Sequence, residues 1–198
     1  MSEHYYSEKP TVESDRKTWK YVLCNHSFTF QSDRGVFSKN EVDFGSKLLI
    51  ETFVMPEVSG AVLDVGCGYG PIGLAIAKQY EREVQMIDIN ERAVELAKDN
   101  AKLNSISNVN IYQSNLFERV QDQKFAAILT NPPIRAGKKV VHEIFEKSYR
   151  CLVEDGELWV VIQKKQGAPS AIEKMKELFA EVEVVEKKKG YYIIMARK

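Results

Sequence analysis

A polar amide stands at the end of an apolar run and is followed at once by two prolines. The segment "FAAILTNPPI" places Asn131, Pro132 and Pro133 directly after residues that favour a buried strand. Proline has no backbone donor and a fixed φ, and it pushes the preceding residue towards extended conformations, so the strand must end here. The result is a rigid turn that holds a hydrogen-bonding side chain in one place. An Asx-type turn that merely ends a strand is the alternative interpretation.

A second segment suited to chemistry is rich in glycine. "LDVGCGYGPIG" carries Gly66, Gly68, Gly70 and Gly73 between a strand-like run and a helix-like run. Glycine lets a ligand approach the backbone closely, and the first amides of a helix attract anions. The spacing from Gly68 fits G-x-G-x-x-G, and Asp88 follows about 20 residues later, where an acid can accept hydrogen bonds from ribose hydroxyls. The pattern favours a nucleotide-like ligand over a tight turn without one.

A nicotinamide dinucleotide is the obvious rival ligand, and two features count against it. Asp64 precedes the first glycine by two residues, where its charge would be unfavourable beside a pyrophosphate but favourable beside an ammonium group. Beyond the loop, the sequence shows no hydride-transfer site and no separate substrate domain.

The elements that must position these segments alternate along the chain. Apolar periodicity predicts strands at 61–66, 84–89, 109–113, 125–130 and 156–163, and helices at 71–80, 91–104, 138–152 and 168–180. Runs at 181–186 and 190–196 predict a final hairpin. This order predicts an α/β fold: a Rossmann-like, doubly wound, seven-stranded and mostly parallel sheet with a C-terminal antiparallel hairpin. Ligands of such sheets bind beyond the carboxyl ends of the strands, where both segments lie.

The part before this alternation is organised differently. Residues 1–18 are charged and turn-rich, so we expect a flexible N-terminal arm, with a single domain over residues 19–198. Short apolar runs at 21–25 and 28–33 predict a small hairpin. A helix is expected from Asp43 onwards, with Asp43 as its N-cap.

Composition narrows the functional class. The 198 residues contain 28 Lys and Arg and 28 Asp and Glu, so no overall positive field indicates a nucleic-acid partner, although local basic runs remain candidates. No apolar stretch approaches the roughly 20 residues that cross a bilayer, and the polar start lacks the pattern of a secretory signal, so the expected location is the cytoplasm. The three cysteines are scattered and indicate neither a disulfide framework nor a metal site.

The glycine segment, together with "MIDIN", resembles motifs I and II of the class I S-adenosyl-L-methionine-dependent methyltransferases. "SNLF" is similar to a third motif of that family, in which many members carry Asp at the position of Asn115. The resemblance implies S-adenosyl-L-methionine as cofactor. It also implies the following contacts: the methionine end against Asp64, Gly66, Gly68 and Gly70; the ribose on Asp88; the adenine beside Ile89, Asn115 and Leu116.

"NPPI" resembles motif IV of methyltransferases that act on planar nitrogens, such as base amines and glutamine amides. Such a nitrogen is a weak nucleophile because its lone pair is delocalised. The resemblance implies that the Asn131 side-chain oxygen and the Pro132 carbonyl accept its N–H groups as it becomes tetrahedral, and that Pro132 and Pro133 hold both acceptors still. Asn131 would then also border the cofactor.

The longer strings "NPPIRAGK" and "DRGVFSKNEVDFGSKLL" closely resemble the C family of small-subunit ribosomal RNA guanine-N2 methyltransferases. That resemblance implies methyl transfer to the exocyclic N2 amine of guanine in 16S ribosomal RNA. Phe37 would contact the cofactor, Ile134 the base, and Arg135 and Lys138 the RNA phosphates. The best-known members carry an additional N-terminal domain, and we expect this chain to correspond to their catalytic half alone.

Two other functions remain open at this stage. One keeps the fold but changes the target to an adenine amine or a protein glutamine; Ile134 counts against it, since those enzymes usually have an aromatic residue there. The other is a non-catalytic domain that binds cofactor or RNA. The intact Asn-Pro-Pro turn counts against that one, because binding alone does not require it. Oligomeric state cannot be read from the sequence.

Overall fold

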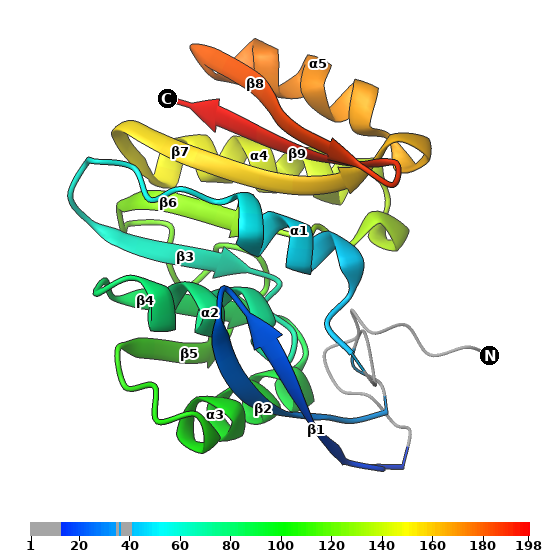
Figure 1. The fold of residues 1–198 in the computed structure, drawn as a ribbon. Helices are drawn as coiled ribbons and strands as arrows, with labels where there is room; N and C mark the ends of the chain where they lie inside the picture. The colour runs from blue at the N-terminus through cyan, green and yellow to red at the C-terminus, as the bar shows by residue number, and fades with distance from the viewer. Residues whose placement is uncertain (1–12, 35, 37–40) are drawn as a thin grey trace.

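The computed structural model describes residues 13–34, 36 and 41–198, and a seven-stranded sheet forms its centre (Figure 1). The strand order is β5-β4-β3-β6-β7-β9-β8, in which β9 is antiparallel to β7 and β8 and the other neighbours are parallel. The strands are β3 (Ala61–Val65), β4 (Val84–Asp88), β5 (Val109–Gln113), β6 (Phe125–Thr130), β7 (Leu152–Gln163), β8 (Glu181–Lys188) and β9 (Tyr191–Arg197). The expected fold class is confirmed.

Helices cover both faces of this sheet (Figure 1). The α-helices are α1 (Phe44–Thr52), α2 (Pro71–Gln79), α3 (Glu91–Leu103), α4 (Lys138–Cys151) and α5 (Ala168–Leu178), and two 3-10 turns, η1 (Ile134–Ala136) and η2 (Lys164–Gln166), follow β6 and β7. Asp43 is the N-cap of α1, as expected, and accepts a hydrogen bond from the backbone N–H of Ser46. Pro71 opens α2, where its missing N–H costs nothing.

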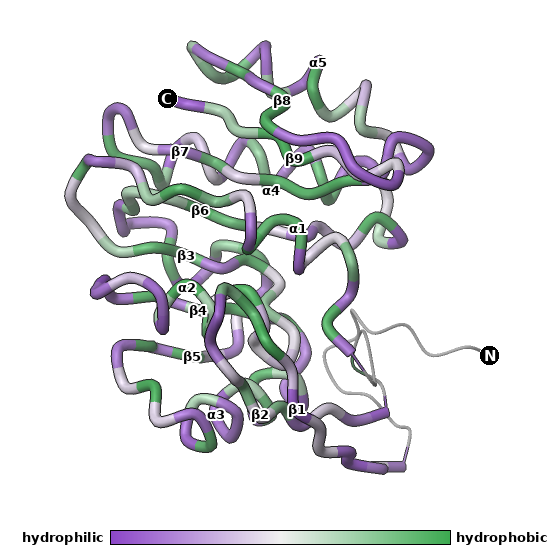
Figure 2. Tube along the Cα trace, in the orientation of Figure 1, coloured by the Kyte–Doolittle hydropathy of each residue, from purple (hydrophilic) through white to green (hydrophobic). Residues whose placement is uncertain are grey.

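The core is divided into two clusters by the alternation of side chains along each strand. Ala127 and Leu129 of β6 enter the cluster beneath α1, α2 and α3, whereas Ile128 between them enters the cluster beneath α4 and α5. Figure 2 shows the hydrophobic residues concentrated along the central strands. Burial on both faces explains why β6 reads as an uninterrupted apolar run in the sequence.

The strand order reverses between β3 and β6, because the chain passes from β3 to β4 and β5 on one side and returns to β6 on the other. Register places Val65 of β3 opposite both Ile87 of β4 and Thr130 of β6. The residues that follow these three in the chain are Gly66, Asp88 and Asn131. Gly66, Asp88 and Asn131 therefore lie side by side at the carboxyl edge of the sheet. This is the switch point where ligands of such sheets bind.

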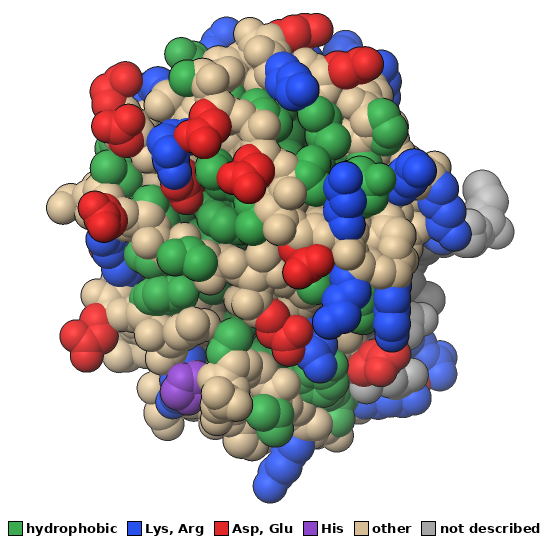
Figure 3. All heavy atoms as spheres, turned by 45° about the horizontal axis from the view of Figure 1, so that its top comes forward, with side chains coloured by type: hydrophobic (Ala, Val, Ile, Leu, Met, Phe, Trp, Pro, Cys, Tyr) green, Lys and Arg blue, Asp and Glu red, His purple; other side chains and the backbone are tan. Residues whose placement is uncertain are grey.

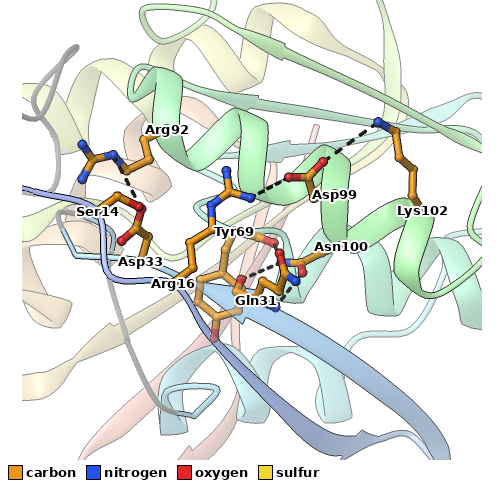
Figure 4. A network of polar contacts seen from close by, with 9 residues as sticks. All are labelled: Ser14, Arg16, Gln31, Asp33, Tyr69, Arg92, Asp99, Asn100 and Lys102. Carbon is orange, nitrogen blue, oxygen red and sulfur yellow. Dashed lines mark hydrogen bonds and ion pairs between the residues drawn. The ribbon is translucent and has the colours of Figure 1, made fainter.

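A separate two-stranded hairpin, β1 (Lys17–Leu23) and β2 (His26–Ser32), packs beside α3 and does not join the main sheet. The side chain of Asn100 on α3 hydrogen-bonds the backbone of β2 as a neighbouring strand would. Its Oδ1 accepts from Gln31 N at 2.7 Å, and its Nδ2 donates to Gln31 O at 2.9 Å and to Tyr69 O at 2.8 Å (Figure 4). One buried amide thus fixes both the hairpin and the glycine loop.

The segment before β1 also makes contacts with the domain. Ser14 donates to Asp33 at 2.6 Å, and Arg16 pairs with Asp99 at 3.0 Å (Figure 4). β1 begins at Lys17, two residues before the expected domain boundary. Within the described residues, no helix is long and apolar enough to cross a bilayer.

Candidate active site

A cavity of about 470 Å³ opens at the rim where β3, β4 and β6 end. Most of the residues expected to bind cofactor or to act in catalysis line it: Gly66, Gly68, Asp88, Ile89, Asn115, Leu116, Asn131, Pro132 and Pro133. Its size falls within the range of small-molecule and cofactor sites. Positions far apart in the chain therefore share one pocket.

The glycine loop presents bare backbone to this cavity. Gly66 and Gly68 have φ values of +75° and +56°, and a Cβ added to either would meet no atom within 4 Å. Their missing side chains therefore leave open space on the cavity side. Gly70 differs, because a Cβ there would lie 2.9 Å from Leu74 and 3.1 Å from Met86, so its role is in packing the start of α2.

Asp88 joins the end of β4 to the glycine loop. Its Oδ2 accepts from Gly68 N at 2.8 Å and its Oδ1 from Asn90 N at 2.8 Å. Burial raises the pKa of the carboxyl, and the backbone hydrogen bonds partly offset that rise. Each carboxylate oxygen can accept a further hydrogen bond, so Asp88 can receive hydroxyl donors from the cavity without losing its contacts to the loop.

Asp64 lies beneath the loop and does not line the cavity. It is 1% exposed; its Oδ2 accepts from Gly73 N at 2.8 Å, and its Oδ1 has no hydrogen-bond partner among the described residues. Burial raises the pKa of this carboxyl to about 7 against the hydrogen bond from Gly73, and the nearby charge of Asp88 adds to the rise. The site thus contains a buried acid that a cation in the cavity would help to ionise.

Asn115 and Leu116 form the far end of the cavity, after β5. The Asn115 Nδ2 donates to Glu118 Oε1 at 3.0 Å. Because a carboxylate can only accept, the nitrogen faces Glu118 and the Asn115 oxygen faces away from it. That oxygen can accept a hydrogen bond from an amine.

Asn131 is held on its nitrogen side by α1. Nδ2 donates to Asp43 Oδ1 at 3.2 Å and to Ser46 Oγ at 3.1 Å, and all three residues line the cavity. Among the described residues no group donates to the Asn131 oxygen or to the carbonyl of Pro132, whereas the carbonyl of Pro133 accepts from Ala136 N at 2.9 Å. Two acceptors at the turn are therefore available to a ligand.

Other expected site residues lie outside the cavity wall. Ile134 packs against the core cluster beneath α4 and α5, while Arg135 and Lys138 are exposed on the rim next to it. Their roles towards a substrate stay predictions. Phe37 lies outside the described residues.

Several lining residues were not expected from the sequence. Val36, Asp43 and Ser46 belong to the upstream string "DRGVFSKNEVDFGSKLL", from which only Phe37 was expected to contact the cofactor, and Tyr69 belongs to the glycine loop. Another group could have been found from the sequence, because positions 140, 143, 144 and 147 have the spacing of one helix face. These residues of α4 all line the cavity: Val140, Glu143, Ile144 and Lys147.

The Cys67 thiol and the grouping of metal-ligating side chains were two further features to consider at this site. Cys67 lies in the loop, but burial raises the pKa of its thiol well above the usual value, and Asp88 and Asp64 raise it further. A thiol kept protonated is a poor nucleophile. In residues 13–34, 36 and 41–198, no group of three His, Cys, Asp or Glu side chains is arranged to hold a metal ion.

Comparison with known proteins places this geometry in a family. The model of the methyltransferase small domain matches residues 27–195. The chain is 68% identical over the full length of both proteins to YbxB, an uncharacterized protein of Bacillus subtilis. It is 32% identical to ribosomal RNA small subunit methyltransferase C of Aliivibrio fischeri, over 96% of this chain and 56% of that protein.

Solved structures agree on the fold. A 16S rRNA N2 methyltransferase from T. thermophilus, solved with AdoMet and guanosine, superposes with a TM-score of 0.84 at 23% identity, covering 96% of this chain and 52% of that one. A methyltransferase from Pyrococcus furiosus superposes with a TM-score of 0.67 at 21% identity, covering 76% and 79%. The chain spans about half the length of the ribosomal RNA methyltransferases that it matches.

The family model covers most of the chain, including nearly all of β2, the glycine loop, the Asn-Pro-Pro turn and most of the last strand. It confirms the expected class of enzyme and, at the level of the family, the expected cofactor. The chain therefore belongs to the methyltransferase small domain family of S-adenosyl-L-methionine-dependent methyltransferases.

Proposed function

We propose that this protein transfers a methyl group from S-adenosyl-L-methionine to the exocyclic N2 amine of guanine in small-subunit ribosomal RNA. The observation that carries the proposal is a pair of acceptors at Asn131 and Pro132 to which no described residue donates, on the rim of a cavity that also contains the glycine loop. The names of the relatives support the substrate: several are ribosomal RNA small subunit methyltransferases C. An RNA substrate of this kind would place the protein in the cytoplasm.

The cavity fits the cofactor on grounds of its own. Gly66 and Gly68 leave open space where side chains would stand, and Asp88 retains acceptor capacity for ribose hydroxyls. The Oδ1 of Asp64, which no described residue hydrogen-bonds, lies beneath the loop and suits a positively charged ligand above it. Bound S-adenosyl-L-methionine would supply an electrophilic methyl group on a sulfonium.

The residues of the turn would serve the amine. Guanine N2 carries two N–H groups in the plane of the base, and two acceptors are available to receive them: Asn131 Oδ1 and the Pro132 carbonyl. On methylation the amine nitrogen would gain positive charge, and these acceptors would stabilise that charge because they are already oriented. One proton then leaves the nitrogen for solvent, since an amide and a carbonyl oxygen are weak bases. The two prolines limit the movement of both acceptors.

A basic surface beside the cavity supports an RNA substrate. Exposed cations lie at or after the ends of β6, β7 and β8 on the Asn131 side of the rim: Arg135, Lys138, Lys139, Lys164, Lys165, Lys187, Lys188 and Lys189. Lys164 N donates to the carbonyl of Gly190 at 2.8 Å, which joins η2 to the β8–β9 turn. Figure 3 shows Lys and Arg side chains gathered on the right-hand side of its view. Such a surface attracts phosphates although the chain as a whole is neutral.

Aromatic rings accompany these cations. Phe44 and Tyr191 lie 5.5 Å apart between centroids, and the ammonium of Lys189 stands 4.8 Å from the Phe44 ring. Phe44 follows Asp43, the partner of Asn131, so the aromatic pair adjoins the turn. Rings beside cations are the usual means of holding unstacked bases of single-stranded RNA.

The test is transfer of labelled methyl from S-adenosyl-L-methionine to small ribosomal subunits, and separately to naked 16S RNA, from a strain that lacks this protein. We expect label in the RNA, recovered as N2-methylguanosine after digestion, and far slower transfer by the Asn131→Ala variant. Label on an adenine amine or on protein glutamine would replace the proposed substrate by an alternative. No transfer to any acceptor would favour a binding domain without catalysis.

A further inference from the structure

The carboxamide of Asn131 can face the cavity in two ways, with its oxygen or with its nitrogen, and only one can serve an amine. The oxygen and nitrogen ends of a carboxamide have nearly the same shape. Their hydrogen-bond partners distinguish them. The partners here come from the first turn of α1, distant in sequence. Asp43 and Ser46 therefore decide which end the cavity receives.

Two of the three contacts share one carboxylate oxygen of Asp43. Asp43 Oδ1 accepts from Asn131 Nδ2 at 3.2 Å and from Ser46 N at 3.0 Å. Ser46 Oγ lies 3.1 Å from Asn131 Nδ2, and Ser46 is 3% exposed. Both α1 residues line the cavity beside Asn131.

Chemistry fixes the orientation. An ionised carboxylate accepts hydrogen bonds and cannot donate, so the carboxamide must turn its nitrogen towards Asp43. A flip would place the Asn131 oxygen against the carboxylate oxygen, replacing attraction by repulsion. Ser46 alone would not choose, because a hydroxyl can accept from the nitrogen or donate to the oxygen. The orientation therefore depends chiefly on Asp43, and Ser46 adds a second contact to the same nitrogen.

The position of α1 is itself fixed by close packing at Gly45. A Cβ on Gly45 would stand 2.8 Å from a ring carbon of Tyr191, so only glycine lets the β9 ring pack against the start of the helix. Thr130, immediately before Asn131, is buried and donates to the carbonyl of Val65 at 2.9 Å. Both sides of the Asp43–Asn131 contact are thus anchored to the sheet.

We propose that Asp43 and Ser46 are positioning residues that hold the Asn131 oxygen towards the target amine; this rests on the proposed function. The N-cap role of Asp43 does not account for the contact. A cap requires only the bond from the Ser46 N–H, and the bond to Asn131 adds nothing to it. The carboxylate thus has two separable functions.

Substitutions can separate them. Asp43→Ser keeps a side chain that caps helices about as well as Asp but removes the acceptor that orients Asn131. Ser46→Ala keeps the cap and removes the second contact. Glu51→Ala is the matched control, because Glu51 lies on α1, pairs only with Lys47 in the described part of the molecule, and is remote from the turn. We expect turnover to fall about 10-fold in Asp43→Ser and less in Ser46→Ala, with KM and unfolding temperature nearly unchanged.

A double-mutant cycle distinguishes a positioning role from a structural one. If Asp43 acts through Asn131, Asp43→Ser should lower turnover in the wild-type background and have no further effect in the Asn131→Ala background. Equal, independent losses in both backgrounds would overturn the proposal. Glu51→Ala should leave turnover unchanged in both.

A second readout needs no catalysis. The side-chain amide signals of Asn131 in a nitrogen–proton NMR spectrum can be assigned by their loss in Asn131→Ala. Their hydrogen exchange should be several-fold faster in Asp43→Ser and Ser46→Ala than in wild type or Glu51→Ala, because the hydrogen-bonded nitrogen is released. Unchanged exchange in Asp43→Ser would refute the orienting contact. Faster exchange in a protein that transfers no methyl would support the contact and reject the proposed function.

Discussion

Asp64 makes the stability of this protein depend on pH in a direction that can be calculated. The carboxyl is buried, with a pKa of about 7 in the folded chain and an ordinary value of 3.8. Between these values the folded protein keeps a proton that the unfolded chain has lost, so stability decreases as pH rises through this window. At 1.36 kcal/mol per pH unit, ionising Asp64 costs about 4 kcal/mol of stability once the pH exceeds 7.

The perturbation that isolates this effect is Asp64→Asn, which keeps an oxygen for the Gly73 N–H and cannot ionise. Burying the side-chain nitrogen of the new Asn costs the same free energy at every pH, so it does not affect how the stability difference varies with pH. The free energy of unfolding of the variant, relative to wild type, should therefore rise by about 1.4 kcal/mol per unit between pH 5 and 7 and level off above 7.

The assay is urea unfolding of both proteins at pH 5, 6, 7 and 8, with Asp122→Asn, an exposed carboxyl, as the control for the loss of one acid. Other titrating groups are common to the pair and largely cancel. A difference between wild type and Asp64→Asn that does not vary with pH would mean that Asp64 ionises in the folded state as it does in water. The interpretation of this buried acid would then be wrong.

Three further predictions concern the cavity and its rim. Asn131→Ala should lower turnover by about 10²–10³ while calorimetry shows nearly unchanged cofactor affinity; equal losses would make Asn131 a binding or structural residue. Asp88→Ala should weaken cofactor binding by roughly 1.5–3 kcal/mol, and unchanged affinity in calorimetry would exclude a ribose contact. Replacing Lys187, Lys188 and Lys189 by Ala should weaken binding of a single-stranded RNA and make the affinity less dependent on salt, as measured by fluorescence anisotropy. Lys98→Ala on α3 is the control. An unchanged dependence of affinity on salt would exclude the β8–β9 turn from the RNA-binding surface.

The sheet could be predicted because its signals are local. The run "FAAIL" has the continuous apolarity of a strand buried on both faces, and Pro71 marks the first turn of a helix without reference to any other segment. The β7 strand shows where such signals stop. It begins at Leu152 and not at Gly156, because the "LVED" segment has no apolar periodicity and its strand character depends on tertiary pairing: Leu152 lies opposite Phe125 of β6.

The site was predictable only in part, for a related reason. Gly66, Asp88 and Asn131 follow strand ends, so the order of elements brings them to one rim. The contact between Asp43 and Asn131 spans 88 residues and depends on where α1 packs, which no local pattern specifies. Asp64 shows that a local pattern can identify a residue without fixing where its side chain lies. Its place before the glycines suggested contact with a ligand, whereas the inward-facing side of β3 puts its carboxyl beneath the loop, on the N–H of Gly73.

The central claim is that the turn's amide and carbonyl oxygens receive a planar amine while the methyl group approaches from the glycine loop. A crystal structure of this protein with S-adenosyl-L-methionine tests it most directly. The account predicts the ribose on Asp88 and the reactive methyl carbon directed towards the side-chain oxygen of Asn131. A cofactor bound elsewhere, or a methyl carbon turned away from Asn131, would contradict it.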